Sequence, residues 1–130
     1  MFKHVIAGAI SHLPFSPAVM VGDLVFVSGQ ASVDAESGAI ISDTFEGEMR
    51  RSFENLLRVL RSTDCEFSNL VSVRCYLDKQ ERLCEFNEIY RNMIPAPYPA
   101  RTTLIGVLGS DFLKFEVDAI AHRQASAQPG

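Results

Sequence analysis

A short apolar run, Leu24–Ser28, sets the strictest condition on the fold. In a β-strand successive side chains point to opposite faces, so Leu24 and Phe26 would share one face and Val25 and Val27 the other. A strand that is apolar on both faces needs to be covered on both faces. The chain is therefore expected to form a sheet with cover on each side of this strand.

Alternating or β-branched apolar residues indicate further strands. They predict strands at Lys3–Ala7, Val19–Val21, Leu24–Ser28, Val71–Leu77, Thr102–Ile105 and Leu113–Ala121. Gly22-Asp23 is typical of a tight turn and predicts a hairpin between the second and third of these strands.

Apolar residues at helical spacing predict a pair of helices. The first begins at Asp43 and Glu46, which have the spacing of a capping box, and ends near Thr63. The second runs over about 80–94 and is stopped by Pro95. Such a pair covers only one face of a sheet of about five or six strands, and leaves the other to solvent or to neighbouring subunits. The outward-facing apolar residues of Leu24–Ser28 favour subunits, so we expect an α+β fold that forms an oligomer.

Composition limits the class of function. The chain has 130 residues and a net charge of -4, so it offers no basic surface for a nucleic-acid backbone. This length predicts a single domain over residues 1–123, followed by a flexible polar tail over residues 124–130.

Cysteine usage and hydropathy predict the compartment. Cys65, Cys75 and Cys84 form no C-x-x-C pair, which argues against a zinc site or a disulfide framework and fits a reducing environment. No apolar run is long enough for a membrane span, and the N-terminus lacks the apolar core of a signal peptide. These features predict a cytoplasmic protein without a membrane partner.

Arg101 is the strongest candidate for binding an anion. It follows Pro97 and Pro99, which favour an extended chain, and stands at the mouth of the strand Thr102–Ile105. A guanidinium placed there can bind a carboxylate or a phosphate through two hydrogen bonds. A surface salt bridge is the alternative interpretation.

Polar groups also interrupt two apolar elements. Asn87 lies on the apolar face of the second helix, where its amide needs a partner. A hydrogen bond between helix and sheet is favoured there over contact with a ligand. Ser28-Gly29-Gln30 ends the apolar strand with a hydroxyl, a backbone open to close approach and an amide, or it forms a simple turn.

The last predicted strand carries a pair of carboxylates. Glu116 and Asp118 share one face because they are two residues apart. Carboxylates in such a position can transfer protons in catalysis. Lys114 and Arg74 can equally neutralise them as part of an ordinary ion-paired surface.

Other catalytic signals are missing from the sequence. His4, His12 and His122 are scattered and suggest neither a catalytic triad nor a metal site. No serine lies in a nucleophile-elbow motif, and no glycine-rich loop is spaced to hold phosphate. Spacing alone therefore predicts an anion-binding α+β domain and nothing more specific.

Segments spread over nearly the whole chain resemble the Rid (YjgF) family of reactive-intermediate deaminases. They are 14–17 (PFSP), 24–30 (LVFVSGQ), 54–56 (ENL), 86–90 (FNEIY), 99–103 (PARTT) and 115–121 (FEVDAIA). Each is weak alone, but together they occur in order and with family-like spacing. The resemblance implies a chorismate-mutase-like fold, in which two helices back one face of a mixed sheet, and a homotrimer with a ligand cleft between subunits.

The resemblance also implies an activity, the hydrolysis of enamine and imine acids such as 2-aminoacrylate and 2-iminopropanoate to a 2-oxo acid and ammonia. It assigns binding of the substrate carboxylate to Arg101 and lining of the cleft to Ser28 and Asn87. Glu116 falls at the position near the attacking water. This chemistry requires no metal and no organic cofactor, and its partner is a small imino or enamino acid.

Two positions depart from the family pattern. Phe15 stands where the family often has a tyrosine, so the cleft lacks a hydroxyl, and Thr103 stands where many members have a cysteine. Both are assigned to substrate binding, together with Gly29, whose backbone is expected to polarise the imine nitrogen. The departures leave open a different substrate, or a non-catalytic module that binds small acids. RNA cleavage, which is also attached to this family's name, is disfavoured by the negative charge.

Overall fold

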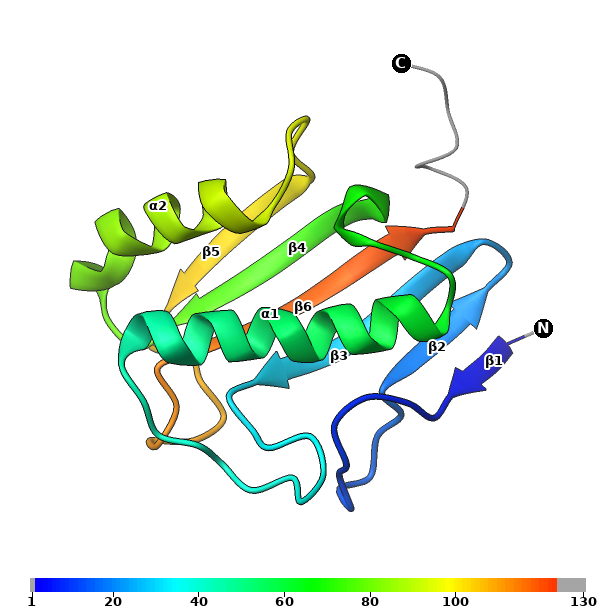
Figure 1. Cartoon of the computed structure of the whole chain (residues 1–130), viewed down its shortest axis with the longest axis horizontal. Helices are drawn as coiled ribbons and strands as arrows, with labels where there is room; N and C mark the ends of the chain where they lie inside the picture. The colour runs from blue at the N-terminus through cyan, green and yellow to red at the C-terminus, as the bar shows by residue number, and fades with distance from the viewer. Residues whose placement is uncertain (1, 124–130) are drawn as a thin grey trace.

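A computed structural model describes residues 2–123 of the chain (Figure 1). The predicted tail over residues 124–130 lies outside the described residues. The strands are β1 Phe2–Val5, β2 Ala18–Val21, β3 Leu24–Ala31, β4 Leu70–Leu77, β5 Ala100–Ile105 and β6 Phe115–His122. The α-helices are α1 Phe45–Ser62 and α2 Leu83–Met93, and short 3₁₀ turns occupy Phe67–Asn69 and Gln80–Arg82.

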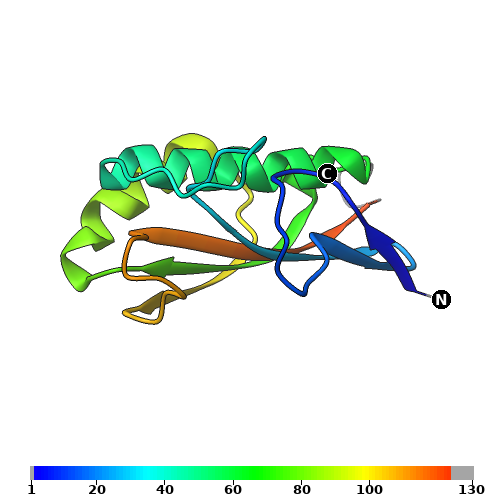
Figure 2. The same cartoon turned by 90° about the horizontal axis from the view of Figure 1, so that it is seen from below.

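The strands form one mixed sheet in the order β1-β2-β3-β6-β4-β5. Neighbouring strands are antiparallel except β4 and β5, which run parallel and are connected through α2. Figure 2 shows that both helices lie on one side of the sheet. The predicted α+β class, a mixed sheet backed on one face by two helices, is confirmed.

The hydrophobic core fills the space between the helices and the sheet. Helix α1 buries Met49, Phe53 and Leu56 completely, and α2 contributes the fully buried Phe86. These side chains recur every three or four residues in α1, which is the spacing that places them on one helical face. Among the helices of the described residues, none is long and apolar enough to cross a membrane.

Strand β3 has the predicted double-sided apolar character. Val25 is fully buried under the helices, whereas Phe26 is 41% exposed on the opposite face. The residue paired with Phe26 on β6 is Ile120, so apolar side chains lie next to each other on this open face. The predicted hairpin is also confirmed, and Gly22 takes the positive φ of 60° that its tight turn requires.

The predicted capping box at the start of α1 is wrong. Thr44 is the N-cap, and its Oγ1 accepts a hydrogen bond from the Gly47 amide at 3.1 Å. The Asp43 carboxylate instead accepts bonds from the Thr44 amide and from Arg51. Glu46 pairs with Arg50 one turn later. Asp43 and Thr44 both have side chains that can cap a helix. Because the Asp43 carboxylate bonds to the Thr44 amide and to Arg51, Thr44 is the cap.

Several element bounds also differ from the prediction. In the predicted strand Val71–Leu77, the apolar residues at every second position from Val71 alternate with polar ones, which predicts that Val71 faces the core. Val71 is exposed instead, because the pairing of β4 with β6 shifts register between Leu70 and Ser72. Such a bulge reverses the facing of the residue it contains. Strand β6 begins at Phe115 instead of Leu113, β1 ends at Val5, and the first turn of the second predicted helix is a separate 3₁₀ turn.

Candidate functional site

Arg101 is fixed at the edge strand β5 by aromatic rings of helix α2. The Arg101 guanidinium carbon lies 4.8 Å from the ring centroids of both Phe86 and Tyr90. One guanidinium nitrogen, Nη2, donates a hydrogen bond to Asn87 Oδ1 at 2.9 Å. Within residues 2–123, none of the ion pairs involves Arg101, so the alternative of a surface salt bridge is wrong. The guanidinium keeps donors available for an anion.

A small hollow lies beside this guanidinium. Its volume is about 230 Å³, and its lining, here named the arginine hollow, comprises Asn87, Tyr90, Arg91, Tyr98, Pro99 and Arg101. The Tyr90 hydroxyl is buried and has no hydrogen-bond partner in the described part of the chain. Burial raises the pKa of Tyr90 to about 12, so the phenol stays neutral. For Asn87 the expected bond between helix and sheet is confirmed, and the residue lines the hollow as well.

Glu116 lies on the other face of the sheet. Its neighbours along β6, Phe115 and Val117, are fully buried under the helices, so Glu116 points to the open face. A Cβ atom at Gly29 would overlap the Glu116 carboxylate. Only glycine therefore allows the carboxylate to lie against the backbone of β3.

Ser28 and Gly29 belong to a bulge within β3. The pairing of β3 with β6 shifts between Val27 and Gln30, and the strand continues to Ala31, so the alternative of a simple turn is wrong. The Ser28 hydroxyl donates to the Ser16 carbonyl at 2.6 Å. This bond ties the segment that carries Phe15 to the bulge.

A second hollow forms around these groups. It has a volume of about 390 Å³, and its lining, here named the glutamate hollow, comprises Phe15, Val27, Ser28, Gly29, Arg74, Glu116 and Asp118. Four of the predicted site residues, Phe15, Ser28, Gly29 and Glu116, thus meet in one place.

Glu116 itself has no hydrogen bond or ion pair among the described residues. Arg74 pairs with Asp118 at 2.9 Å, and the Tyr76 hydroxyl donates to the same carboxylate at 2.6 Å. The alternative of an ion-paired surface is therefore confirmed for Asp118, which pairs with Arg74, and wrong for Glu116, because Lys114 pairs with a different carboxylate. Burial, and secondly the charge of Asp118, raise the pKa of Glu116 above its usual range.

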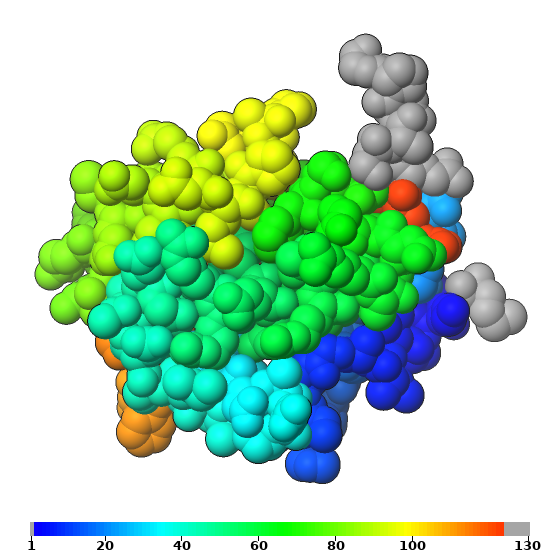
Figure 3. Space-filling view, in the orientation of Figure 1, coloured from blue at the N-terminus to red at the C-terminus, as the bar shows by residue number. Residues whose placement is uncertain are grey.

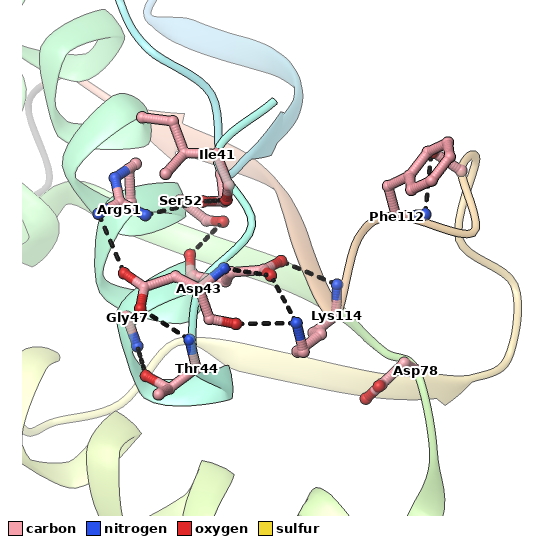
Figure 4. Close-up of polar contacts among 12 residues, drawn as sticks. Ile41, Asp43, Thr44, Gly47, Arg51, Ser52, Asp78, Phe112 and Lys114 are labelled. Atoms are coloured by element: carbon pink, nitrogen blue, oxygen red, sulfur yellow. Dashed lines mark hydrogen bonds and ion pairs between the residues drawn. The ribbon is translucent and has the colours of Figure 1, made fainter. Parts of the chain in front are cut away.

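The partner of Lys114 is a carboxylate that sequence reasoning missed. Glu48 of α1 is completely buried and accepts hydrogen bonds from the Lys114 amide at 2.9 Å, from Lys114 Nζ at 3.1 Å and from the Asp43 amide at 3.1 Å. Lys114 Nζ also donates to the Asp43 carbonyl, as Figure 4 shows. One sequence signal was present, because Glu48 lies one turn after Phe45 and next to Met49, on the apolar side of the helix.

Thr103 lies away from both hollows. It pairs with Cys75 in the parallel register of β4 and β5, two residues beyond Arg101, and is partly buried. It is not among the residues that line either hollow. Its predicted role in binding rests on its place beside Arg101 on the strand.

The two hollows lie on opposite faces of one sheet. Arg101 contacts α2 on the helix-covered side, whereas Glu116 faces the open side. A single chain therefore divides the predicted residues into two groups. Within residues 2–123, no three His, Cys, Asp or Glu side chains are arranged to hold a metal ion.

Comparisons with known proteins agree with this architecture. A family model described as Endoribonuclease L-PSP matches residues 7–123. The chain is similar to Protein mmf2, mitochondrial, from Schizosaccharomyces pombe, with 37% identity over 111 residues, which are 83% of this chain and 86% of that protein. It is also similar to human 2-iminobutanoate/2-iminopropanoate deaminase, with 29% identity over 88% of this chain and 82% of the human protein. The crystal structure of RidA from the Antarctic bacterium Psychrobacter has the same fold, with a TM-score of 0.81, 23% identity and coverage of 88% of this chain and 93% of that one.

Proposed function

Because the chain belongs to the Endoribonuclease L-PSP family, which includes the Rid proteins, we propose that it hydrolyses reactive 2-imino and enamino acids to 2-oxo acids and ammonia. The observation that carries this proposal is the Arg101 guanidinium, held over two aromatic rings beside a small hollow and without a carboxylate partner among the described residues. The name of the human relative, an imine deaminase, supports the same substrate class.

Arg101 binds and orients the substrate in this proposal. A guanidinium and a carboxylate match through two parallel hydrogen bonds, which fix the plane of the acid. The contacts of Arg101 with Phe86, Tyr90 and Asn87 hold the guanidinium in place before the substrate arrives. Pre-organisation of this kind lowers the entropy lost on binding and places C2 of the substrate consistently.

Glu116 activates water. An enamine such as 2-aminoacrylate first tautomerises to the imine, whose C2 is electrophilic. Water adds to C2 while its proton passes to the Glu116 carboxylate. That proton moves to the nitrogen and gives a carbinolamine, with a hydroxyl and an amino group on C2. The hydroxyl proton then transfers through the same carboxylate to the nitrogen, the C–N bond breaks, and ammonia leaves as the C2 carbonyl forms. A carboxylate whose pKa is raised holds a proton more readily between these two steps.

The complete site needs a second copy of the chain in this proposal. Arg101 and Glu116 lie on opposite faces of one sheet, so one chain cannot apply both to the same small acid. The apolar open face, with Phe26 exposed beside Ile120, supports contact with another subunit there. We propose a homotrimer, for which light scattering would give about three times the chain mass of 14.4 kDa. A monomer at micromolar concentrations would contradict it.

The family description names an endoribonuclease, which is a competing function. The net charge of -4 gives little attraction for a phosphate backbone. The hollow beside Arg101, about 230 Å³, suits a small acid better than a nucleic-acid strand. We therefore favour hydrolysis of imino acids over cleavage of RNA.

The decisive assay generates 2-aminoacrylate with a serine dehydratase and follows formation of the 2-oxo acid with and without the protein. We expect acceleration by the wild type. Arg101→Lys keeps the charge but loses the planar fork, so its rate should fall about ten- to a hundred-fold. Arg50→Lys, in the exposed ion pair with Glu46, is the matched control, and its rate of 2-oxo acid formation should equal that of the wild type. Full acceleration by Arg101→Ala would remove the support for deamination, and binding of 2-oxo acids without acceleration would identify a non-catalytic module.

A further inference from the structure

A third hollow adjoins the glutamate hollow. It has a volume of about 390 Å³ and shares Phe15, Gly29 and Glu116 with the glutamate hollow. Beyond Glu116 its lining is largely apolar, and we name it the apolar hollow. Its large apolar residues are Ile10, Leu13, Phe15, Val33, Ile40 and Leu113.

These apolar side chains are exposed to an unusual degree. Ile10 is 48% exposed and Leu13 is 67% exposed, and both belong to the same concave surface. Scattered exposed apolar residues are normal, whereas a contiguous concave group indicates a binding site.

The walls of the apolar hollow are built before any ligand binds. The Ile10 amide donates to the Ala35 carbonyl at 3.0 Å, and an isolated bridge pairs Val33 with Ile40. Gly38 has a φ of 76°, and a Cβ atom there would overlap the Ile10 carbonyl, so the two segments touch closely. Figure 3 shows these segments, coloured blue and cyan, side by side at the edge of the molecule next to α1.

The two adjoining hollows differ in polarity. Glu116 lines both hollows, and Ser28, Arg74 and Asp118 line only the polar one. The other side offers aliphatic and aromatic surface. A ligand that fits both sides has a polar reacting centre and a bulky apolar substituent.

We propose that the apolar hollow receives the side chain of the substrate, so that this protein prefers 2-imino acids with large aliphatic or aromatic side chains over 2-iminopropanoate. The proposal rests on the proposed function, because it places C2 of the imine beside Glu116. The methyl group of 2-iminopropanoate would leave nearly all of the apolar hollow to water. An isobutyl or benzyl group would cover Ile10 and Ile40 on the two walls.

The preference is measured with imines that an L-amino-acid oxidase forms from alanine, leucine and phenylalanine. Catalase removes the peroxide, and semicarbazide traps the imine that has not been hydrolysed. A single methylene in an apolar pocket changes kcat/KM by roughly 10- to 200-fold. We therefore expect kcat/KM for the leucine-derived imine to be at least about tenfold higher than kcat/KM for the alanine-derived imine. Equal or lower kcat/KM for the larger imine would overturn this inference and leave deamination intact.

A pair of identical substitutions locates the preference. Ile10→Trp fills the apolar hollow, whereas Ile6→Trp adds the same ring at a neighbouring position that is 95% exposed and lines none of the hollows described above. We expect the ratio of kcat/KM for the leucine- and alanine-derived imines to fall at least about tenfold in Ile10→Trp and to stay unchanged in Ile6→Trp. Ile40→Trp fills the hollow from the opposite wall and tests the same point should Ile10→Trp fold poorly. A ratio that falls in neither Ile10→Trp nor Ile40→Trp contradicts the assignment.

Binding of stable products separates the two proposals. Calorimetry with 4-methyl-2-oxopentanoate and pyruvate requires no turnover. Tighter binding of the larger acid, lost in Ile10→Trp or Ile40→Trp, supports the apolar hollow even where no imine is hydrolysed, and in that case deamination alone fails. Equal binding of both acids, with normal hydrolysis of imines, refutes the apolar hollow alone.

Discussion

Two glutamates of this protein, Glu48 and Glu116, are both withdrawn from solvent but differ in their partners. The Glu48 carboxylate is fully buried and accepts three hydrogen bonds, two from Lys114 and one from the Asp43 amide. The Glu116 carboxylate is partly buried against Gly29 and accepts none from residues 2–123. Its closest charged neighbour on the strand is another carboxylate, Asp118, which is already engaged by Arg74.

The comparison separates a structural carboxylate from a chemical one. Glu48 is a buried charge, and both of its carboxylate oxygens accept hydrogen bonds. These bonds hold together the start of α1 and the loop that leads into β6. A carboxylate that is desolvated and unpaired is destabilised as an anion, which favours proton uptake. The fold thus contributes a rigid start to β6 two residues before the group that we assign to proton transfer.

Replacing Glu116 by glutamine should produce the largest effect on turnover. Glu116→Gln keeps the shape and removes the base, so imine hydrolysis should fall by about 10²–10⁴-fold. The pKa of Glu116 is higher in the fold than its usual 4.5, so the folded protein loses stability as the pH rises above that value and the carboxylate ionises. The melting temperature of Glu116→Gln at neutral pH should therefore equal or slightly exceed that of the wild type.

Calorimetric melting and the imine assay on the same preparation check this pair of effects. Glu88→Gln, on the exposed surface of α2, is the matched control and should change neither quantity. A large drop in melting temperature with normal specific activity would show that Glu116 is structural after all.

Removing the Lys114 cation should mainly lower stability, whereas removing the Glu116 base should mainly lower turnover. Lys114→Met leaves the buried Glu48 carboxylate without its counter-charge, and we expect the free energy of unfolding to fall by roughly 3–5 kcal/mol. Urea denaturation measures this loss. Lys79→Met, at an exposed lysine, should stay within about 0.5 kcal/mol of the wild type. An equally small change in Lys114→Met would mean that water replaces the lysine at Glu48.

Glu48→Gln should have a smaller effect on stability than Lys114→Met. It leaves Lys114 partly exposed, so the cation can reach water, and we expect a loss of about 1–3 kcal/mol. Activity per folded molecule should remain within about tenfold of the wild type, because Glu48 lines none of the three hollows. The double variant Glu48→Gln/Lys114→Met should be more stable than Lys114→Met alone, since the unpaired buried charge is gone. Strictly additive losses would show that the two residues are not coupled.

Local patterns predicted most of the fold. The alternation in β3 and β6 and the helical spacing of apolar residues in α1 depend only on neighbours in the chain, so they gave the correct elements and faces. The bulges at Val27–Gln30 and Leu70–Ser72 depend on the register of each strand against β6. That register is a long-range property, and for this reason the facing of Val71 was predicted incorrectly.

The candidate site was only partly predictable for the same reason. Arg101 and Asn87 were identified from their local surroundings, and the structure joins them by a hydrogen bond. Which carboxylate of β6 is paired depends on β4, because Arg74 lies directly opposite Asp118 and Tyr76 directly opposite Glu116. No local pattern carries that information.

The smallest expected effect is a shift in the pH dependence of turnover. The charge of Asp118 contributes to the raised pKa of Glu116, although burial contributes more. Asp118→Asn removes this charge and leaves Arg74 without its partner, and both changes favour the Glu116 carboxylate. The acid limb of the profile of kcat/KM should therefore move to lower pH, while the rate at neutral pH changes little. Asp78→Asn removes a carboxylate from a comparable ion pair with Arg82 and should leave the acid limb in place. An acid limb that is the same in both variants would mean that Glu116 does not set the protonation step.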